Sequence, residues 1–544
     1  MRDMQRKNNQ KQEEKHRSRE SLEKRRFLFD QRWITVLLVF VFLLTFGIRL
    51  YYAFSTDTFT GDQAYYHLRQ IEQIGETFKP LVEDELSYQG RTNLVQPLYD
   101  YVLAFFTLFF SPEFVGKLIP NLFASLLIFV VYFTTKDLTG DPEAALVSAF
   151  ISGFIPIFFA ETINSISPYT LAIPLFFYMV YCFYKGAEET TSPLAEKHPR
   201  LRYVYQFIFL FFLLTLLNNM TLVLLLALVV YFILLKLEKL KAEPIEKEVF
   251  LFCLFLFLWV QLIMYKKAFL MHGLGVIWQN IPEQIVDAYF RQVDLAMIIP
   301  LIGIIPLLYG LYAISHYLFQ TKGKKEYLLI ALIFASGGLL WARLIRLELA
   351  LMIIGVALSI LFSELYKSTF LYIEKTRFSR LKLMVWMGFI LVLVAFTTIP
   401  SLYFTSLSMQ DALSQEEVQA LEWIEKNTRK NQVVLGAPRE GHSIAAIAKR
   451  KNVMDTNFFF IENPGIIFDD VKDLFYTQNS IVLMKRLQKY KVDYLYLSQR
   501  SRIFYGLQEY VILNTAKRQP QCFRRVYQNQ EVSIFKVLCK VREL

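Results

Sequence analysis

The loop that follows the first long apolar run carries a compact group of polar side chains. It reads Thr-Gly-Asp62-Gln-Ala-Tyr-Tyr-His67-Leu-Arg69. A carboxylate such as that of Asp62 can bind a divalent cation or act as a general base, and His67 and Arg69 could contact a phosphate. Equally, Asp62 could be a solvated acid that caps a helix beginning near Ala64. On spacing alone, the capping role is the simpler of the two.

Two further acids stand close to the ends of later apolar runs. Glu161 lies in the stretch Phe-Ala-Glu161-Thr-Ile-Asn164, and Glu283 lies in Asn280-Ile-Pro-Glu283-Gln. Taken singly, each acid could be a side chain in the headgroup region or in a solvated loop. Glu161 gains interest because it stands at the same outer surface as Asp62 if the intervening runs cross the bilayer. Glu161 could then meet Asp62, whereas Glu283 alone is a weak signal.

Arg343 and Arg346 lie in a short turn between two apolar runs. Charged side chains at that depth cost free energy unless they are paired or hydrated. They could pair with the nearby Glu348, or they could bind the phosphates of a lipid substrate. The sequence leaves both possibilities open.

The composition indicates a membrane protein. Of the 544 residues, 54% are hydrophobic and only 20% are charged, whereas soluble domains average about 45–50% apolar and about 25% charged residues. The net charge of +11 is concentrated at the N-terminus and between apolar runs, where membrane topology explains it better than nucleic-acid binding does. We therefore expect contact with membrane lipids and none with nucleic acid.

The apolar runs predict about eleven transmembrane helices. The run over 203–240 is too long for one helix and is expected to divide at Asn218-Asn219. The segment 97–111 is apolar but opens with Pro97 and contains Asp100, and we expect it to lie at the outer interface. The predicted spans are 33–53, 117–135, 142–160, 168–185, 204–218, 220–236, 249–265, 297–318, 327–341, 347–363 and 383–403.

The positive-inside rule orients these spans. If 97–111 does not cross, the basic loops share one side with the basic N-terminus, and that side is the cytoplasm. These loops are 186–203, 236–248, 319–326 and 364–382. The opposite, extracytoplasmic side then holds the first loop 54–116, the turn 161–167, the loop 266–296 and residues 404–544.

Three parts of the chain follow from this topology. Residues 1–32 hold eleven Lys/Arg and six Asp/Glu and are expected to form a disordered cytoplasmic tail. Residues 33–403 form the transmembrane part. Within residues 404–544, the residue patterns predict helices over 416–427 and 480–490 and strands over 433–436 and 492–497. This alternation predicts a small soluble α/β domain. Cys522 and Cys539 flank a probable hairpin and could form a disulfide outside the cell.

The order of these motifs resembles the GT-C superfamily of polyprenyl-phosphate-dependent membrane glycosyltransferases, most closely the catalytic subunit of archaeal oligosaccharyltransferases. The resemblance rests on the Asp62-x-x-Tyr-Tyr-His-x-Arg loop, the Gln-Pro-Leu-Tyr opening of the next helix and an acid at the outer end of a later span. It implies that Asp62, Glu161 and Glu283 hold Mn²⁺ or Mg²⁺ and serve catalysis. It further implies that Arg343 or Arg346, with His67 or Arg69, contacts the lipid phosphate.

Two stretches depart from the family pattern. The second-loop motif usually has two acids, whereas this chain has Glu161 and Asn164. The family's tail signature Trp-Trp-Asp-Tyr-Gly, which binds the hydroxyl residue of the acceptor, corresponds here to Ala-Pro-Arg-Glu440-Gly441-His442. The resemblance therefore implies only by position that these last three residues bind the acceptor.

The function expected from the sequence is transfer of a glycan from a polyprenyl-phosphate or -diphosphate donor to an extracytoplasmic acceptor, with protein asparagine as the leading candidate. A second possibility is transfer of a single sugar to a lipid, glycan or hydroxyl acceptor. A transporter or flippase is a more distant possibility, because the acids cluster at one surface and no internal repeat is visible. An inactive scaffold also stays open, since the motifs are incomplete.

Overall fold

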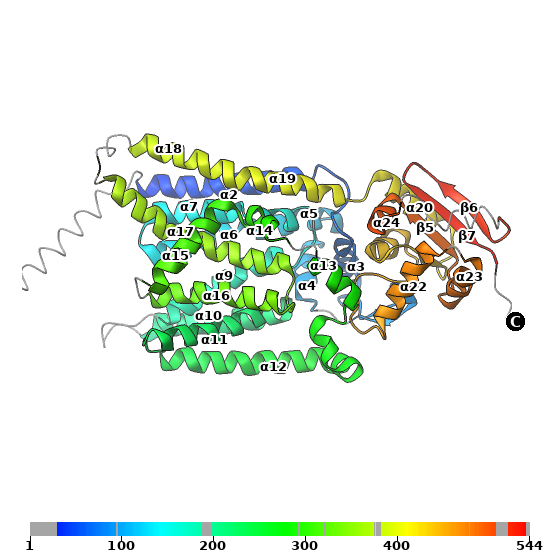
Figure 1. Cartoon of the computed structure of the whole chain (residues 1–544), viewed down its shortest axis with the longest axis horizontal. Coiled ribbons are helices and arrows are strands. Elements are labelled where there is room, and N and C mark those ends of the chain that lie inside the picture. The colour runs from blue at the N-terminus through cyan, green and yellow to red at the C-terminus, as the bar shows by residue number, and fades with distance from the viewer. Residues whose placement is uncertain are drawn as a thin grey trace, which may run out of the picture.

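The structure is a computed structural model that describes residues 30–93, 96–187, 197–291, 294–319, 323–374, 376, 382–477, 479–507 and 520–539. It has two regions that follow each other along the long axis (Figure 1). One is a bundle of long helices, and the other is a smaller region built around a sheet near the C-terminus. Most of the predicted tail over 1–32 lies outside the described residues.

Helices cover all eleven predicted spans. They are α2 (Gln31–Ala53), α5 (Pro112–Ser125), α6 (Leu127–Thr139), α7 (Pro142–Gly153), α8 (Pro156–Thr162), α9 (Tyr169–Gly186), α10 (Lys197–Leu217), α11 (Thr221–Leu237), α12 (Pro244–His272), α14 (Leu295–Ile302), α15 (Ile304–Phe319), α16 (Lys324–Trp341), α17 (Leu347–Glu374), α18 (Lys382–Leu393) and α19 (Ile399–Ser408). The break between α10 and α11 falls at the predicted Asn218-Asn219, although α10 packs mainly against α9 and α11 against α16 rather than against each other.

Length and hydropathy qualify five helical stretches of the described chain as membrane spans, or up to seven if each bent pair counts as one. The predicted number of eleven therefore stays a prediction. One bent pair is α7 and α8, which meet at 47°. The other is α14 and α15, which meet at 94° around Gly303, whose φ of 101° favours glycine.

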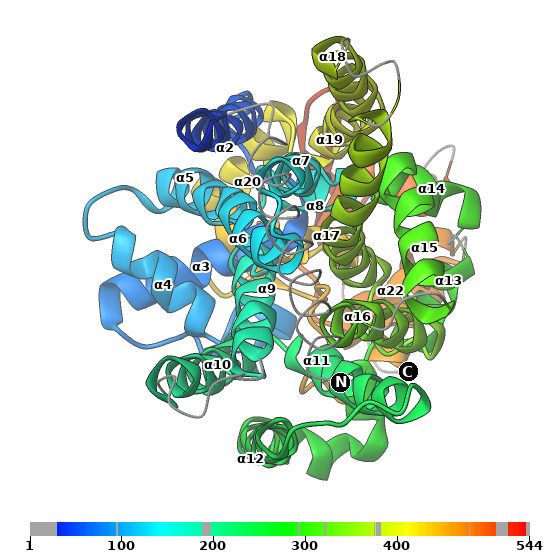
Figure 2. The ribbon, with the colours of Figure 1, turned by 90° about the vertical axis from the view of Figure 1, so that its left-hand side faces the viewer.

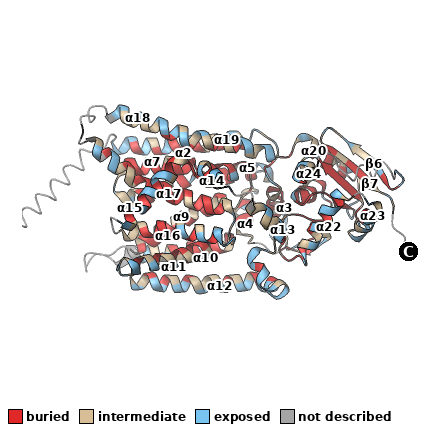
Figure 3. Cartoon of the chain, viewed as in Figure 1, coloured by how far each residue is buried: buried red, intermediate tan, exposed pale blue. Residues whose placement is uncertain are grey.

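Helix α17 lies inside the bundle and is buried along most of its length, whereas α2, α12 and the pair α18–α19 are mostly exposed at its periphery (Figures 2 and 3). The exposed side chains on these outer helices are largely apolar, as expected for helices that face lipid. The interior position of α17 matters for function because Arg346 and Glu348 stand at its beginning.

The first loop forms two helices, α3 (Asp62–Thr77) and α4 (Leu98–Phe106), with a small hairpin of β1 (Glu83–Asp84) and β2 (Arg91–Thr92) between them. The nine residues of α4 extend about 14 Å, roughly half of the hydrocarbon core. This length agrees with the expectation that 97–111 does not cross the membrane.

The C-terminal region contains a five-stranded sheet in the order β4-β3-β5-β7-β6. Strand β3 pairs in parallel with β4 and β5, and β7 pairs antiparallel with β5 and β6. The strands are β3 (Val433–Leu435), β4 (Lys451–Asn452), β5 (Tyr494–Ser498), β6 (Phe523–Gln528) and β7 (Val532–Val537). The helices around them are α20 (Gln415–Asn427), α22 (Pro464–Tyr476), α23 (Ser480–Lys489) and α24 (Gln499–Phe504).

Several local predictions for this region are confirmed. Helices α20 and α23 and strands β3 and β5 fall where the sequence patterns placed them. The β6–β7 hairpin turns at residues 529–531, and Cys522 and Cys539 form a disulfide at its open end. Strand β4 and helix α22 had no clear signal in the sequence.

Candidate active site

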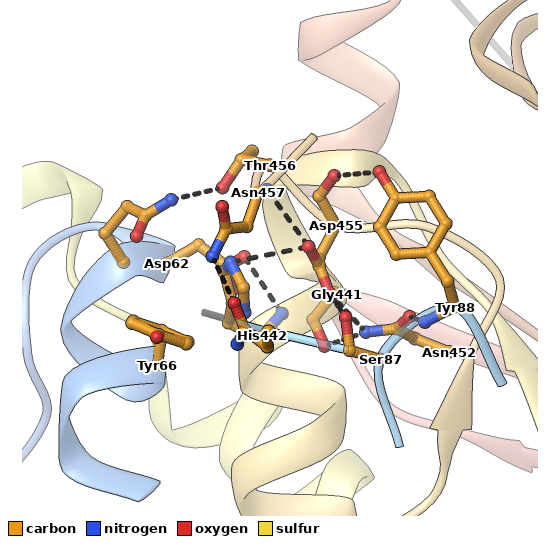
Figure 4. A network of polar contacts seen from close by, with 12 residues as sticks. Asp62, Tyr66, Ser87, Tyr88, Gly441, His442, Asn452, Asp455, Thr456 and Asn457 are labelled. Carbon is orange, nitrogen blue, oxygen red and sulfur yellow. Dashed lines mark hydrogen bonds and ion pairs between the residues drawn. The ribbon is translucent and has the colours of Figure 1, made fainter. Parts of the chain in front are cut away.

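Asp62 joins the first loop to the C-terminal region. It is the first residue of α3, and its carboxylate accepts hydrogen bonds from the backbone N–H groups of His442 (2.9 Å) and Ser443 (2.8 Å) (Figure 4). Helix α3 is preceded by Gly61, and no side chain caps it. Asp62 therefore does cap a helical segment, but the segment is the turn from Gly441 onward rather than its own helix. The prediction that it caps the helix near Ala64 is wrong in that respect.

The environment of Asp62 favours its neutral form. Burial raises the pKa of its carboxyl well above the ordinary value, the two backbone N–H groups oppose this effect, and the charges of Asp455 and Glu440 add to it. Each carboxylate oxygen has a second lone pair besides the one used by a backbone N–H. Asp62 can thus still accept another hydrogen bond or proton.

Glu440 and Gly441 serve the packing of this junction. Glu440 is buried and accepts hydrogen bonds from the backbone N–H of Ala437 (2.9 Å) and the hydroxyl of Ser501 (2.5 Å), and also from the hydroxyl of Ser498. Burial raises its pKa to about 7, against the opposing effect of the serine hydroxyls. At Gly441, a Cβ atom would lie 2.4 Å from the carbonyl oxygen of Met454, so only glycine fits there.

His442 is fully buried in the same junction. Its ring lies 5.4 Å from that of Tyr66 on α3, and its Nε2 lies 3.6 Å from Asp455 Oδ1. Burial lowers the pKa of His442 to about 4, so the ring is neutral at physiological pH. Glu440, Gly441 and His442 thus lie beside Asp62, yet their side chains are enclosed by the protein.

Asp455, which the sequence analysis did not single out, is the centre of this polar network (Figure 4). Its carboxylate accepts hydrogen bonds from Ser87 Oγ (2.6 Å) and the backbone N–H of Asn457 (3.0 Å), and it pairs with Arg91 at 3.4 Å. The side chain of Asn452 donates to it as well (3.2 Å). The network thereby fastens the β1–β2 hairpin of the first loop to the C-terminal region.

His67 and Arg69 are both engaged by acids of the first loop. His67 Nδ1 lies 2.7 Å from Asp100 Oδ1, and the Arg69 guanidinium donates two hydrogen bonds to Asp84 (2.9 and 2.7 Å). These pairs hold α4 and the β1–β2 hairpin against α3. The role in phosphate binding that the sequence suggested for both residues stays a prediction.

Glu161 and Asn164, two polar residues of the second-loop motif, point to different parts of the molecule. Asn164 points inward, where its Nδ2 donates to Thr56 Oγ1 (3.1 Å) and to the carbonyl of Thr58 (2.9 Å). Glu161 is exposed, and its electrostatic partners are Glu348 and Arg346. The residue that meets the first loop is therefore Asn164, and Glu161 faces α17 instead.

Arg343 and Arg346 differ sharply in their partners. Arg343 pairs with Asp287 of α13 (Glu283–Arg291) at 2.8 Å. Arg346 is exposed, and none of the ion pairs among the described residues includes it. The carboxylate of Glu348 accepts a hydrogen bond from Tyr289 (2.8 Å). Of these two arginines, Arg346 is therefore the one that is available to an anionic ligand.

Glu283 begins α13 and is exposed. Its helix bridges the two regions: Gln284 donates to Asp469 (3.1 Å) in the C-terminal region, and Tyr289 reaches Glu348. No hydrogen bond of the Glu283 side chain is found within the part of the chain that the structure describes. Its catalytic role therefore stays a prediction.

The predicted trio does not form a ready-made metal site. Across the described residues, no group of three or more Asp, Glu, His or Cys side chains is arranged to hold a metal ion. Asp62 is held by backbone N–H groups of 442 and 443, Glu161 lies beside Arg346, and Glu283 lies at the start of α13. The residues present thus do not fit a metal in this conformation, and the expectation of Mn²⁺ or Mg²⁺ stays a prediction.

Parts of the chain are similar in sequence to known glycosyltransferases. A family profile described as dolichyl-phosphate-mannose-protein mannosyltransferase matches residues 95–263. Dolichyl-phosphooligosaccharide-protein glycotransferase 1 of Archaeoglobus fulgidus is 29% identical over 133 residues, which are 23% of this chain and 22% of that relative. The chain thus spans about a fifth of the length of this curated relative.

Two solved structures share the fold over most of the chain. The oligosaccharyltransferase of Archaeoglobus fulgidus in the apo form aligns with a TM-score of 0.64 at 14% identity, covering 88% of this chain and 71% of that one. The same protein has been solved with Zn and sulfate, and with an inhibitory peptide and a dolichol-phosphate. ArnT from Cupriavidus metallidurans, bound to undecaprenyl phosphate, aligns with a TM-score of 0.54 at 12% identity, covering 93% and 98%.

Proposed function

We propose that this chain, a divergent member of the GT-C superfamily, is a glycan transferase. It transfers a glycan from a polyprenyl-phosphate or -diphosphate donor to an acceptor on the extracytoplasmic side of the membrane. The relatives are glycosyltransferases, and two neighbours of this fold bind a dolichol-phosphate or undecaprenyl phosphate. Such a donor places its prenyl chain in lipid and its phosphate at the surface.

The observation that carries the proposal is the exposed guanidinium of Arg346. It stands at the outer end of the interior helix α17, exposed and outside the ion pairs of the described residues, with Glu161 and Glu348 as electrostatic neighbours. A guanidinium binds phosphate oxygens through paired hydrogen bonds. Arg346 therefore suits the donor phosphate better than Arg343, which Asp287 already occupies.

The reaction needs an anion stabiliser and a base. The acceptor nucleophile attacks the anomeric carbon, the bond from that carbon to the phosphate oxygen breaks, and the phosphate leaves with the electron pair. Arg346 offsets the charge that develops on the phosphate, and the Glu161 carboxylate takes the proton of the acceptor. Asp62 orients the acceptor through the lone pairs that its two backbone partners leave unused.

The orientation of the chain is part of the proposal. The basic loops place the N-terminus in the cytoplasm and the C-terminal region outside. The Cys522–Cys539 disulfide supports this orientation, because disulfides persist mainly in oxidising compartments. With this topology, all candidate site residues lie outside, where about eleven spans would bring the lipid-linked donor to them.

The acceptor has two candidates. Protein asparagine is suggested by the oligosaccharyltransferase relative. However, the acid of the tail stretch, Glu440, is buried and already accepts hydrogen bonds from the hydroxyls of Ser498 and Ser501, so its carboxylate is not accessible to a hydroxyl of an acceptor peptide. This favours the second candidate, a lipid, glycan or hydroxyl acceptor that receives a single sugar.

A reconstituted transfer assay tests these proposals. Purified protein is incubated with a polyprenyl-linked glycan and either a peptide containing an Asn acceptor site or native membrane lipids, with and without Mn²⁺ or a chelator. We expect the donor to be consumed by the wild type and not by Arg346→Met. Glycosylated peptide selects the first acceptor, and glycosylated lipid with bare peptide selects the second. A donor that stays intact with every acceptor and cation contradicts the proposed function.

A further inference from the structure

Arg49 is a buried cation near the outer end of α2. Only 1% of its surface is exposed. Its Nε donates to Asn121 Oδ1 (3.1 Å) and its Nη2 to Thr162 Oγ1 (2.6 Å), and its guanidinium lies 5.6 and 5.1 Å from the ring centres of Phe158 and Phe159. No acidic side chain pairs with it among the described residues. Neutral and aromatic groups alone therefore hold this charge.

Such an arrangement is a poor device for stability. Removing a charge from water costs free energy that neutral partners return only in part, although aromatic faces contribute some attraction. Even complete buried ion pairs can often be replaced by apolar side chains of similar size without loss of stability, so stability alone does not account for a lone buried cation among neutral partners. Charged residues within transmembrane helices are accordingly a sign of function.

The partners of Arg49 lie on the helices that carry the candidate site. Thr162 is the last residue of α8 and follows Glu161 directly. Asn121 lies on α5, and α2 itself leads into the segment that ends at Asp62. Arg49 thus ties the ends of α2 and α8 to the middle of α5.

A second layer of contacts fastens the same segment just above Arg49. Lys117 of α5 donates from Nζ to the carbonyl of Ala53 (2.9 Å), the last residue of α2. The backbone N–H of Thr60 donates to the carbonyl of Asn164 (2.9 Å), while Asn164 Nδ2 donates to the carbonyl of Thr58. The connection between α2 and Asp62 therefore follows the position of the turn after α8.

We infer that Arg49 is a positioning residue for glycan transfer: it fixes the register between the element that carries Asp62 and the element that carries Glu161. The inference rests on the proposed function, since it assigns both acids to one site. Because a displacement of about 1 Å can cost on the order of 100-fold in rate, loss of this register lowers turnover even when the fold survives.

The test compares Arg49→Met, Arg49→Lys and Thr45→Val with the wild type. Thr45 is a matched control, because it is buried on the same face of α2 and its hydroxyl has no partner within the described structure. We expect Arg49→Met to keep the wild-type melting temperature or exceed it, and to lower kcat ten- to a hundredfold with an unchanged KM for the donor. Arg49→Lys should recover part of kcat, and Thr45→Val should match the wild type.

Hydrogen exchange of the backbone gives a readout that does not depend on transfer. We expect residues 54–64 and 161–166 to exchange faster in Arg49→Met than in the wild type and in Thr45→Val. Unchanged exchange in these segments overturns the inference, even if no donor is ever turned over. It is likewise overturned if Arg49→Met keeps full kcat, or if Arg49→Met and Arg49→Lys lose activity only in proportion to lost folding.

Discussion

The two sides of the candidate site differ in how their polar groups are satisfied. On the Asp62 side, nearly every charged group has a protein partner: Asp62 is held by backbone N–H groups, Arg69 by Asp84, and His67 by Asp100. On the α17 side, Arg346 and Glu161 are exposed, and Arg346 has no ion pair within the described residues. The first side is thus held together by its own contacts and offers the acceptor only the remaining lone pairs of Asp62, whereas the second side is open to the donor.

This difference bears on the missing acid of the second-loop motif. An acid at position 164 would sit on the assembled side, where Asn164 donates from its Nδ2 to Thr56 and Thr58. A carboxylate cannot donate those hydrogen bonds. The departure from the family pattern is therefore consistent with a chain in which the turn after α8 serves to hold the first loop.

The largest expected effect concerns the assembled side. Asp455→Ala removes the acceptor shared by Ser87 and Arg91 and leaves a buried guanidinium without its carboxylate. We expect a loss of roughly 3–5 kcal/mol in the free energy of unfolding, measured by denaturation in detergent. Glu462→Ala, which removes an exposed acid of the same region, should change it by less than about 1 kcal/mol. Equal stabilities of the two variants would contradict the assembly role.

The next effect concerns the open side. Arg346→Met should lower kcat/KM for the lipid-linked donor by about 10- to 100-fold, through a higher KM or a lower kcat. This size is expected because a hydrogen bond to a charged group is worth about 1.5–3 kcal/mol. Its melting temperature should stay unchanged. Arg343→Met is the matched control, since it removes an arginine from the same turn whose contacts are an exposed ion pair with Asp287 and the ring of Phe290. A loss of activity confined to Arg343→Met would reverse the assignment.

A smaller effect is expected when the motif is restored. Asn164→Asp supplies the second acid of the family pattern but removes two hydrogen-bond donors from a buried position. We expect it to destabilise the protein by about 1–3 kcal/mol without raising activity at any concentration of Mn²⁺, as followed by melting temperature and initial rate. A gain in transfer activity would show that position 164 belongs to the open side.

The smallest effect is a pH dependence of stability. Burial raises the pKa of Glu440 to about 7. The protonated side chain therefore stabilises the folded protein at low pH, and this stabilisation is lost as the pH rises through 7. Between pH 6.5 and 8 His442, whose pKa is lowered from 6.5 to about 4, acts in the opposite direction, because its unfolded form loses its proton at the start of this range. This smaller effect is the same in the wild type and in Glu440→Gln. The melting temperature of the wild type should therefore fall over this range, and Glu440→Gln should flatten the decline. An equal slope in both proteins would argue against a buried neutral Glu440.

Sequence patterns predicted the elements far better than their contacts. Apolar runs placed the helices, including the break between α10 and α11, because helices that face lipid need long apolar segments. The helix and strand periods of the C-terminal region placed α20, α23, β3 and β5. The 94° bend at Gly303 was not predicted, because a continuous apolar run does not show where a helix changes direction.

The site was predicted only in part for a related reason. The type and position of Asp62 pointed to a special role, but its partners lie 380 and 381 residues further along the chain. Asp455 resembles any polar residue after a short strand until the fold brings Ser87 and Arg91 to it. Arg343 and Arg346 could not be told apart until α13 supplied Asp287 to one of them.

Donor consumption by the wild type and the two arginine variants tests the central claim most directly. A polyprenyl-linked glycan would be followed by mass spectrometry as it loses its sugar in the presence of acceptor, with each protein reconstituted at the same density in lipid vesicles. Our account predicts rapid loss of sugar with the wild type and with Arg343→Met, and a rate lower by about 10- to 100-fold with Arg346→Met. Equal rates for all three proteins would contradict it.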